Sequence, residues 1–245
     1  MQVLALDTAT EACSVALLTE GGLFGRCEDV GRGHADAILG MVDATLAQGR
    51  LRLDQLDGIA ASVGPGAFTG VRICVSVAQG LAFGAGLPVV AVTTLEALAL
   101  QAMRGGARHV VACLDARMGE VYWGCFSAHP QQGLLQHGEL KLSAAAAVTA
   151  AFPGVEAITG IGRGFAAYPV LASLPRLVLG AGAREALPDA RDMATLGALR
   201  LRAGEGQDPA ALTPRYLRNK VAFTEIERAA AKAAAGAAPR RPEGG

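Results

Sequence analysis

The chain lacks an excess of either charge, because its 22 basic and 22 acidic residues give a formal net charge of +0. A neutral chain has no overall field that would draw it onto nucleic acid or an anionic membrane. Any contact with RNA must therefore be local or shared with a partner. The 245 residues are 51% hydrophobic and 18% charged, which is typical of a globular protein with one large or two small domains.

Paired cysteines and a targeting segment are also missing. The five cysteines are scattered and form no C-x-x-C pair, which predicts neither a disulfide framework nor a zinc site and favours a reducing, cytoplasmic compartment. The N-terminal MQVLALDTAT has no basic region before its apolar run, so we expect no signal peptide.

Charge is absent from the stretch between Arg72 and Glu96, which is about as long as a membrane-spanning helix. Three glycines and Pro88 cluster late in this stretch and predict a buried helix followed by a strand. We therefore expect no membrane contact.

The first half of the chain reads as three strands, then two alternations of helix and strand, then a capped helix. Thr69 is expected to cap the second helix, and Thr93 with Glu96 fits a capping box for the third. The predicted strands are Val3–Asp7, Cys13–Thr19, Gly22–Glu28, Ile59–Val63 and Val89–Val92; the helices are Gly33–Gln48, Gly70–Ala82 and a segment starting near Thr94.

The second half repeats this order, and its first strand ends in ACLDARM as the first half's ends in LALDTAT. Asp7 and Asp115 thus stand in like positions, which indicates an internal duplication. The predicted strands are His109–Leu114, Glu120–Phe126, Leu134–Leu140, Val155–Thr159 and Arg176–Leu179; the helices are Ser143–Phe152 and Arg191–Ala203.

Two such α/β lobes are the plan of the actin-like superfamily of sugar kinases, Hsp70 and actin, built from duplicated RNase H-like βββαβα units. We predict an N-terminal lobe over residues 1–105, which carries the partner-binding helices, and a C-terminal lobe over 106–222. Residues 223–245 hold almost no large apolar side chain and are expected to form a disordered tail.

Four motifs, in this order, closely resemble the TsaB (YeaZ) family: LALDTAT, SVGPGAFTGVR, LDARMGEVY and LTPRYLR. The resemblance covers residues 1 to about 222. It implies the dimerisation subunit of the bacterial machinery that adds a threonylcarbamoyl group to N6 of the adenosine beside the anticodon in tRNA. It also implies partners: the catalytic subunit TsaD, the ATPase TsaE, a second copy when the chain is alone, and tRNA only within the complex.

The related TsaD family carries a metal-binding H-x-x-x-H motif at the start of the third helix. Here Thr94 and Leu98 replace the two histidines, while Glu96 between them is kept. An aspartate near Asp189 or Asp192 would hold no metal alone. The resemblance therefore implies a non-catalytic scaffold without a cofactor.

Other candidate residues leave alternatives open. Asp7, Thr8 and Asp115 match the strand ends where actin-like ATPases contact nucleotide, but such residues also serve as ordinary turn formers. The loop Gly160–Gly164 lacks the lysine of a P-loop. His34 is expected to be solvated or at an interface. A basic group of Arg215, Arg218 and Lys220 is expected at the surface, and tRNA phosphates are the alternative partner.

The helix Gly70–Ala82 is apolar all round, so its outward face must meet another helix or another chain. In the family, this helix and the preceding long one form the dimer surface. The predicted interface residues are Ile38, Leu39, Val42, Leu46, Ile73, Val77 and Leu81. The alternative functions are an actin-fold ATPase or kinase that uses Asp7 and Asp115, and a metallopeptidase, against which the missing histidines argue.

Overall fold

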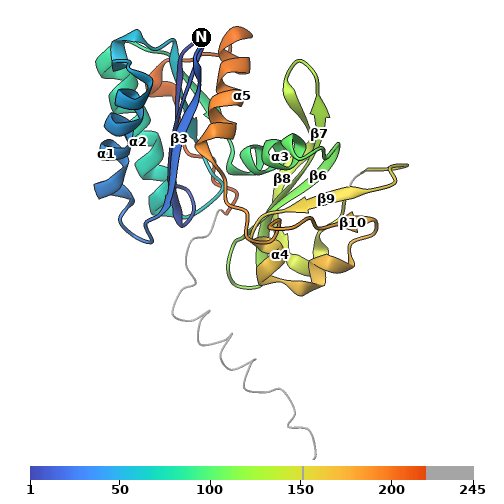
Figure 1. The fold of residues 1–245 in the computed structure, drawn as a ribbon. Helices are drawn as coiled ribbons and strands as arrows, with labels where there is room; N and C mark the ends of the chain where they lie inside the picture. The colour runs from blue at the N-terminus through green and yellow to red at the C-terminus, as the bar shows by residue number, and fades with distance from the viewer. Residues whose placement is uncertain (151, 219–245) are drawn as a thin grey trace, which may run out of the picture.

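Two five-stranded sheets form the framework of the protein in a computed structural model, which describes residues 1–150 and 152–218 (Figure 1). The first sheet has the order β3-β2-β1-β4-β5 and the second the order β10-β9-β6-β7-β8. The strands are β1 Val3–Asp7, β2 Ala12–Thr19, β3 Gly22–Asp29, β4 Gly58–Ser62, β5 Val89–Val92, β6 His109–Asp115, β7 Glu120–His129, β8 Gly133–Ala144, β9 Ile158–Ile161 and β10 Leu177–Val178.

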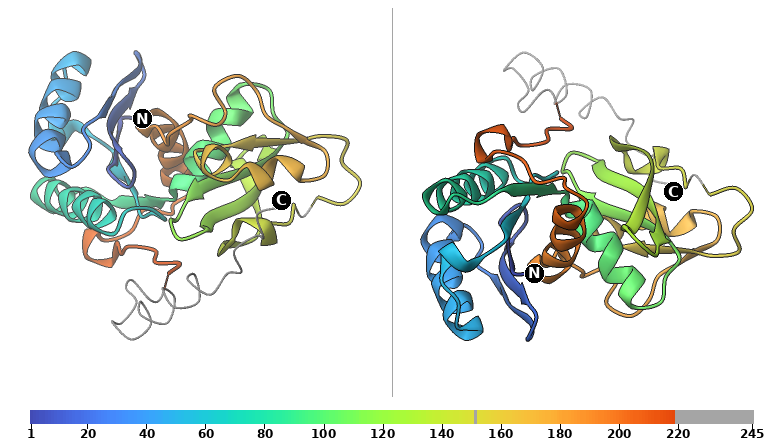
Figure 2. Two further views of the ribbon diagram at one scale, coloured as in Figure 1. Left: turned by 90° about the horizontal axis from the view of Figure 1, so that it is seen from below. Right: turned by 90° about the horizontal axis from the view of Figure 1, so that it is seen from above.

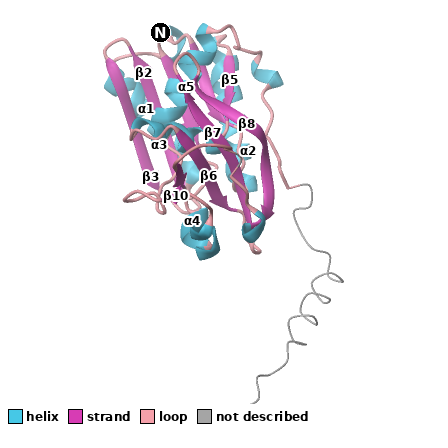
Figure 3. Cartoon of the chain, turned by 90° about the vertical axis from the view of Figure 1, so that its right-hand side faces the viewer, coloured by secondary structure: helices cyan, strands magenta, loops and turns pink. Residues whose placement is uncertain are grey.

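The two sheets share one topology. Strands β1, β2 and β3 are antiparallel, and β4 and β5 continue the sheet parallel to β1. In the second sheet β6, β7 and β8 are antiparallel, and β9 and β10 are parallel to β6. Figure 3 looks onto the second half, where β6, β7 and β8 run side by side. This repeated order confirms the predicted actin-like α/β fold of duplicated RNase H-like units.

The helices form separate layers on these sheets (Figure 2). Helices α1 and α2 cover the outer face of the first sheet, and α3 and α5 lie between the two sheets. A short α4 follows β9. The helices are α1 His34–Gly49, α2 Phe68–Ala85, α3 Thr94–Arg104, α4 Gly164–Ala167 and α5 Ala190–Arg202, and the 3-10 turns are Leu53–Gln55, Ala145–Ala147, Pro169–Ser173 and Pro209–Ala211.

The last helix of each half packs on the sheet of the other half. Helix α3 lies on β6, β7 and β8, whereas α5 lies on β1, β2 and β4, and the two helices contact each other. A single apolar cluster joins the facing sides of both sheets around these helices, with Val3 and Val90 from the first sheet and Val110 and Phe126 from the second. The two lobes are thereby held together by a shared core, which buries apolar surface from both.

The structure corrects a predicted helix, a predicted strand and a predicted cap. The strand expected over Val155–Thr159 is instead β9, Ile158–Ile161, which pairs with β6. The helix expected over Ser143–Phe152 does not form, because β8 continues to Ala144 in register with β7 and only a 3-10 turn follows. Thr69 does not cap α2, because that helix begins at Phe68 and places Thr69 inside its first turn. The tail expected over 223–245 lies outside the described residues.

Candidate functional site

Asp7 and Thr8, at the end of β1, point into the protein rather than into the space between the lobes. Asp7 is 0% exposed, and its Oδ1 accepts a hydrogen bond from the Ala9 N–H at 3.0 Å. Burial raises the pKa of Asp7 to about 6, although the Ala9 N–H and the Ser62 hydroxyl both lower it. Thr8 is also buried and donates to the Gly70 carbonyl oxygen at 2.7 Å. Neither side chain lines the cleft described below, which corrects the predicted nucleotide contact at these two residues.

Two glycines explain why Asp7 and Thr8 are enclosed. A Cβ on Gly66 would lie 2.2 Å from the Ala9 carbonyl oxygen, and one on Gly70 would lie 2.0 Å from that of Thr8. Only glycine permits such an approach. The turn before α2 therefore packs directly on the loop after β1, and backbone fills the space beside these residues.

Asp115, at the end of β6, does line the cleft between the lobes. Its Oδ1 accepts hydrogen bonds from the Arg117 N–H at 2.7 Å and the Tyr168 hydroxyl at 2.9 Å. The Arg117 guanidinium lies 3.2 Å from Oδ2. The carboxylate is thus already engaged by neighbours, and a nucleotide contact at Asp115 stays a prediction.

Thr94 and Leu98, on α3, stand where the TsaD family has its two metal-binding histidines. Both side chains make packing contacts within the protein. The capping box is confirmed: the Thr93 hydroxyl accepts from the Glu96 N–H at 3.2 Å, and Glu96 Oε2 accepts from the Thr93 N–H at 2.7 Å. Thr94 is buried and donates to the Pro65 carbonyl oxygen at 2.5 Å. Leu98 is 0% exposed in the core between the sheets.

The acidic residues near these positions are committed to arginines or to a helix cap. Glu96 forms an ion pair with Arg200 of α5. Asp189 caps α5, and Asp192 lies 2.8 Å from the Arg104 guanidinium. No group of three or more His, Cys, Asp or Glu side chains able to hold a metal ion exists within residues 1–150 and 152–218. The residues present do not fit the metal of the TsaD family.

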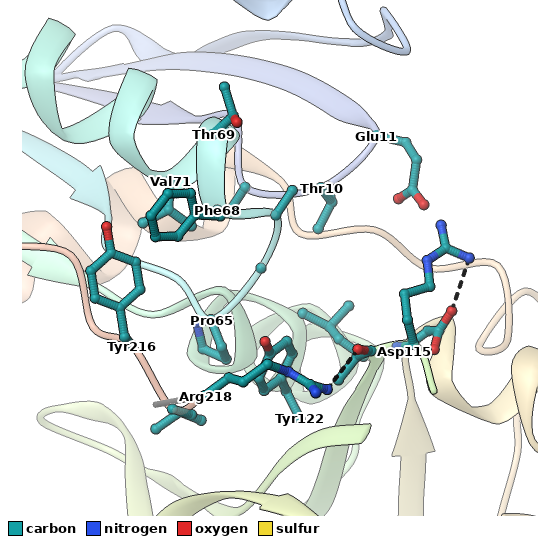
Figure 4. A pocket seen from close by; sticks show the side chains of 18 of the residues that line it. Thr10, Glu11, Pro65, Phe68, Thr69, Val71, Asp115, Tyr122, Tyr216 and Arg218 are labelled. Carbon is teal, nitrogen blue, oxygen red and sulfur yellow. Dashed lines mark hydrogen bonds and ion pairs between the residues drawn. The ribbon is translucent and has the colours of Figure 1, made fainter. Parts of the chain in front are cut away.

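A cleft of about 660 Å³ opens between the two lobes. Phe68 and Tyr216 lie at one end of it, and Glu11 and Asp115 lie at the other (Figure 4). Its charged lining consists of Glu11, Arg32, Asp115, Arg117, Arg163, Arg215 and Arg218. The sequence pointed to Asp115, Arg215 and Arg218 and to the loop that carries Arg163, whereas Glu11 and Arg32 come from segments that only the fold brings to this cleft.

The predicted interface residues divide into two sets. Ile38, Val42 and Leu46 are 0%, 2% and 8% exposed and pack in the core beneath α1 and α2. Ile38 exposes no surface to a partner chain, which corrects the prediction for that residue, and Val42 and Leu46 are committed mainly to the core. The others form a surface: Leu39 is 52% exposed, and Ile73, Val77 and Leu81 are half-buried.

These four residues and their neighbours form what we call the α1–α2 face. A groove of about 410 Å³ on it is lined by Ala35, Leu39, Phe68, Thr69, Arg72, Ile73, Ser76 and Val77. Phe83, near the end of α2, is 76% exposed. Phe68 and Phe83 belong to α2 but lie outside the predicted helix Gly70–Ala82, so they were not among the candidate interface residues.

Within the described residues, α2 is long and apolar enough to cross a membrane by length and composition. A third of it is buried in the fold, and it packs on β4 and β1. A helix that packs one side on a sheet and its opposite side on a partner chain is also long and apolar.

The remaining candidate residues from the sequence are His34, the loop that carries Arg163, and Lys220. His34 is buried, and its Nε2 lies 2.8 Å from the Thr10 carbonyl oxygen, so the expectation of a solvated side chain is wrong. Arg163, from the loop Gly160–Gly164, lies 3.6 Å from Glu11. Lys220 lies outside the described residues.

Comparisons with known proteins match one family model and several related proteins and structures. Residues 21–225 match the family model described as TsaD, tRNA N6-adenosine threonylcarbamoyltransferase. A protein of Escherichia coli (strain K12), described as tRNA threonylcarbamoyladenosine biosynthesis protein TsaB, is 38% identical over 92% of this chain and 98% of its own length. A Haemophilus influenzae protein of the same description is 51% identical over 50% of this chain and 52% of its own length. The solved structure "YeaZ from Pseudomonas aeruginosa" is 40% identical and superposes with a TM-score of 0.82, covering 88% of this chain and 99% of that one.

Proposed function

The chain belongs to the TsaB (YeaZ) family, and we propose that it is a non-catalytic partner subunit in the synthesis of threonylcarbamoyladenosine in tRNA. In this role it pairs with TsaD, which transfers the threonylcarbamoyl group to N6 of the adenosine beside the anticodon. The ATPase TsaE joins the assembly, and tRNA is bound only within it. The setting is the cytoplasm, which agrees with the absence of a disulfide among the cysteines of the described residues.

The proposed non-catalytic role rests on one observation: the residues at and between the expected metal-ligand positions are all engaged in contacts within the protein. Thr94 donates its hydroxyl proton to the Pro65 carbonyl oxygen, Leu98 is enclosed in the core, and Glu96 is paired with Arg200. A metal site needs several ligands with free lone pairs around one open space. Instead, Thr94 holds α3 against the turn before α2, Leu98 fills the core between the sheets, and Glu96 links α3 to α5.

A metal analysis tests this part of the proposal. The purified chain should hold far less than one zinc or iron per molecule after mild chelation. Steady-state phosphate release from ATP should stay well below the common enzyme range of about 1 per second or more. Stoichiometric metal would sink the scaffold role, and turnover that Asp115→Ala abolishes would favour the ATPase or kinase alternative.

The α1–α2 face is the surface that we propose for pairing with TsaD. A stable interface buries on the order of 800 Å² on each partner, and a few apolar side chains near its centre provide most of the binding energy. Leu39, Val77 and Phe83 offer such side chains on neighbouring helices that cover one side of the first lobe (Figure 2).

Charge placed on this face tests the pairing. Leu39→Arg and Val77→Arg should leave the melting temperature nearly unchanged and weaken TsaD binding about a hundredfold or more, because each puts an unpaired charge into an apolar contact. Leu135→Arg is the matched control, since Leu135 is 44% exposed on β8 in the other half. Binding can be measured by titration calorimetry and self-association by sedimentation.

Two results would contradict the proposal that the α1–α2 face binds TsaD. One is normal TsaD binding by both folded variants, and the other is a loss of binding by Leu135→Arg as large as theirs. Ile38→Arg should behave differently from both variants, because Ile38 is buried within the chain and its replacement should unfold the lobe.

A further inference from the structure

Strand β3 is a free edge of the first sheet. The strand order places β2 on one side of β3, and within the described residues no strand pairs with its other side. Figure 3 shows β3 at the outer margin of the first lobe. The backbone N–H and C=O groups along such an edge can pair with a strand of another chain, so proteins commonly protect their edge strands.

The other three sheet edges each carry a recognisable protection. Gln207 covers β5 by exchanging two backbone hydrogen bonds of 2.9 Å with Val89. Strand β10 has only two residues. Strand β8 is irregular, because its register with β7 shifts between Trp123 and Cys125 and Gly138 has a φ of 73°. Short strands, irregular strands and covered edges all hinder pairing with a further strand.

Strand β3 has none of these three protections. Its eight residues pair with β2 in one unbroken register from Gly22 to Asp29, and the stretch from Arg26 to Asp29 is exposed. Arg191 of α5 donates to the Gly25 carbonyl oxygen at 2.6 Å, and that oxygen keeps a second lone pair. A regular, exposed edge of this length can therefore accept another strand.

The charges on β3 select one partner and one register. Arg26 and Glu28 flank Cys27, so their side chains share one face of the sheet, and neither forms an ion pair within the described residues. In a twofold antiparallel pairing centred on Cys27, Arg26 lies opposite Glu28 of the second copy, and this pair occurs twice. A pairing centred on Arg26 or on Glu28 instead sets that residue against its own copy. Opposite charges stabilise a cross-strand pair, whereas like charges destabilise it.

We propose that β3 pairs with β3 of a second copy of this chain, antiparallel and centred on Cys27, so that the two first sheets join into one. One strand pair buries less than the roughly 800 Å² per partner of a stable interface, so the dimer is weak and depends on concentration. The β3 edge shares no residue with the α1–α2 face, and this contact is therefore independent of the proposed pairing with TsaD.

Sedimentation velocity tests the charges in the Leu39→Arg background, which blocks self-association through the α1–α2 face. Arg26→Glu and Glu28→Arg should each weaken dimerisation about tenfold or more, because two attractive pairs become two repulsive ones. A mixture of these two variants should dimerise again, since each charge on one chain then meets its opposite on the other. The control is Glu139→Arg, an equal change of charge at an exposed position of β8, which should dimerise like the parent chain.

Cross-linking by oxidised glutathione tests the register. The two Cys27 Cα atoms should lie about 4.5–5.5 Å apart, which suits a disulfide. Two Cys27 thiols then reduce one glutathione disulfide and give an intermolecular disulfide and two glutathione thiols. Cys27→Ser should abolish the cross-linked dimer, because the other four cysteines are buried. Cys27→Ser/Asp29→Cys should not cross-link either, since its two new thiols stand four residues, or about 13 Å, apart along the paired strands.

Three results would overturn the proposal. The first is a Leu39→Arg chain that stays monomeric at every concentration, as it would if another segment of the chain covered β3. The second is equal dimerisation by the parent, by each charge variant and by their mixture. The third is cross-linking of the Asp29→Cys variant as readily as of Cys27. A failure of the chain to bind TsaD would change none of these measurements, so the two proposals can fail separately.

Discussion

At the scale of a single residue, Asp7 is a carboxyl that folding removes completely from water. Its pKa rises from 3.8 to about 6, so between these pH values the folded state binds a proton that the unfolded state has released. Stability must therefore fall as the pH rises through this window. Above pH 6 the buried charge costs roughly 3 kcal/mol relative to the neutral group.

Asp7→Asn should remove this cost, because the amide keeps an acceptor for the Ala9 N–H and carries no charge. The variant should unfold at higher urea concentration than the parent chain at pH 8, and the gain should shrink towards pH 4. Asp43→Asn, at an exposed position of α1, is the control and should change little. If the variant were destabilised equally at both pH values, hydrogen bonds in the folded state would already compensate for the charge of an ionised Asp7, which would contradict the prediction.

At the scale of elements, α3 and α5 are joined by an ion pair in the shared core. The Asp192 side chain is 0% exposed, and it contacts the half-exposed Arg104 at 2.8 Å. Burial raises the pKa of Asp192 to about 7, although Arg104 lowers it. The arginine therefore offsets part of the cost of a buried carboxylate.

Arg104→Ala should destabilise the protein by about 3 kcal/mol, because it leaves that carboxylate without a counter-charge. The loss should increase as the pH rises, since removal of Arg104 raises the pKa of Asp192 further and the folded state then retains the proton more strongly than the unfolded state. Denaturant melts at pH 6 and pH 8 measure this. Adding Asp192→Asn should recover much of the loss, whereas Arg108→Ala, also exposed, should cost little. An equal loss at both pH values with no recovery by Asp192→Asn would contradict the account.

At the scale of the whole molecule, the segment 209–218 runs from the first lobe to the second. Gln79 of α2 donates to the carbonyl oxygens of Pro209 and Leu212 at 3.0 Å each. At the other end, Arg218 contacts Glu120 and donates to the Ala116 carbonyl oxygen at 2.9 Å. The segment thus links α2 to the turn between β6 and β7 across the cleft.

Arg218→Ala should loosen that turn without unfolding either lobe. We expect faster hydrogen exchange of the amides at 116–120 and unchanged exchange in β1 and β4, because the Arg218 side chain stabilises only the turn. The stability should fall by about 1.5–3 kcal/mol, the usual range for hydrogen bonds to a charged group. Arg202→Ala serves as the control. Uniformly faster exchange in both lobes would show that the link also supports the shared core.

Local patterns determined much of this fold by themselves. Alternating apolar residues between turn signals predict strands wherever they occur, and β1, β2, β3 and β5 agree with the predictions within a residue or two. Thr93 and Glu96 define the start of α3 because a capping box acts within four residues of sequence. Through the resemblance to the TsaD family, the identities of Thr94 and Leu98 imply that two imidazole ligands are missing.

Other properties depend on contacts between distant segments, and only the tertiary structure decided them. Helix α2 is apolar on all sides, so the spacing of its apolar residues does not indicate which side packs on the sheet. The apolar stripe of α1 is broad, so it did not distinguish buried Ile38 from exposed Leu39. Pairing with β7 decided that Ser143 and Ala144 extend a strand rather than begin a helix. Asp7 is sealed by glycines about sixty residues away in sequence, and the arginines of the cleft come from both halves. A sequence pattern reports the neighbours of a residue along the chain, whereas burial and charge at these sites are set by neighbours that only folding brings together.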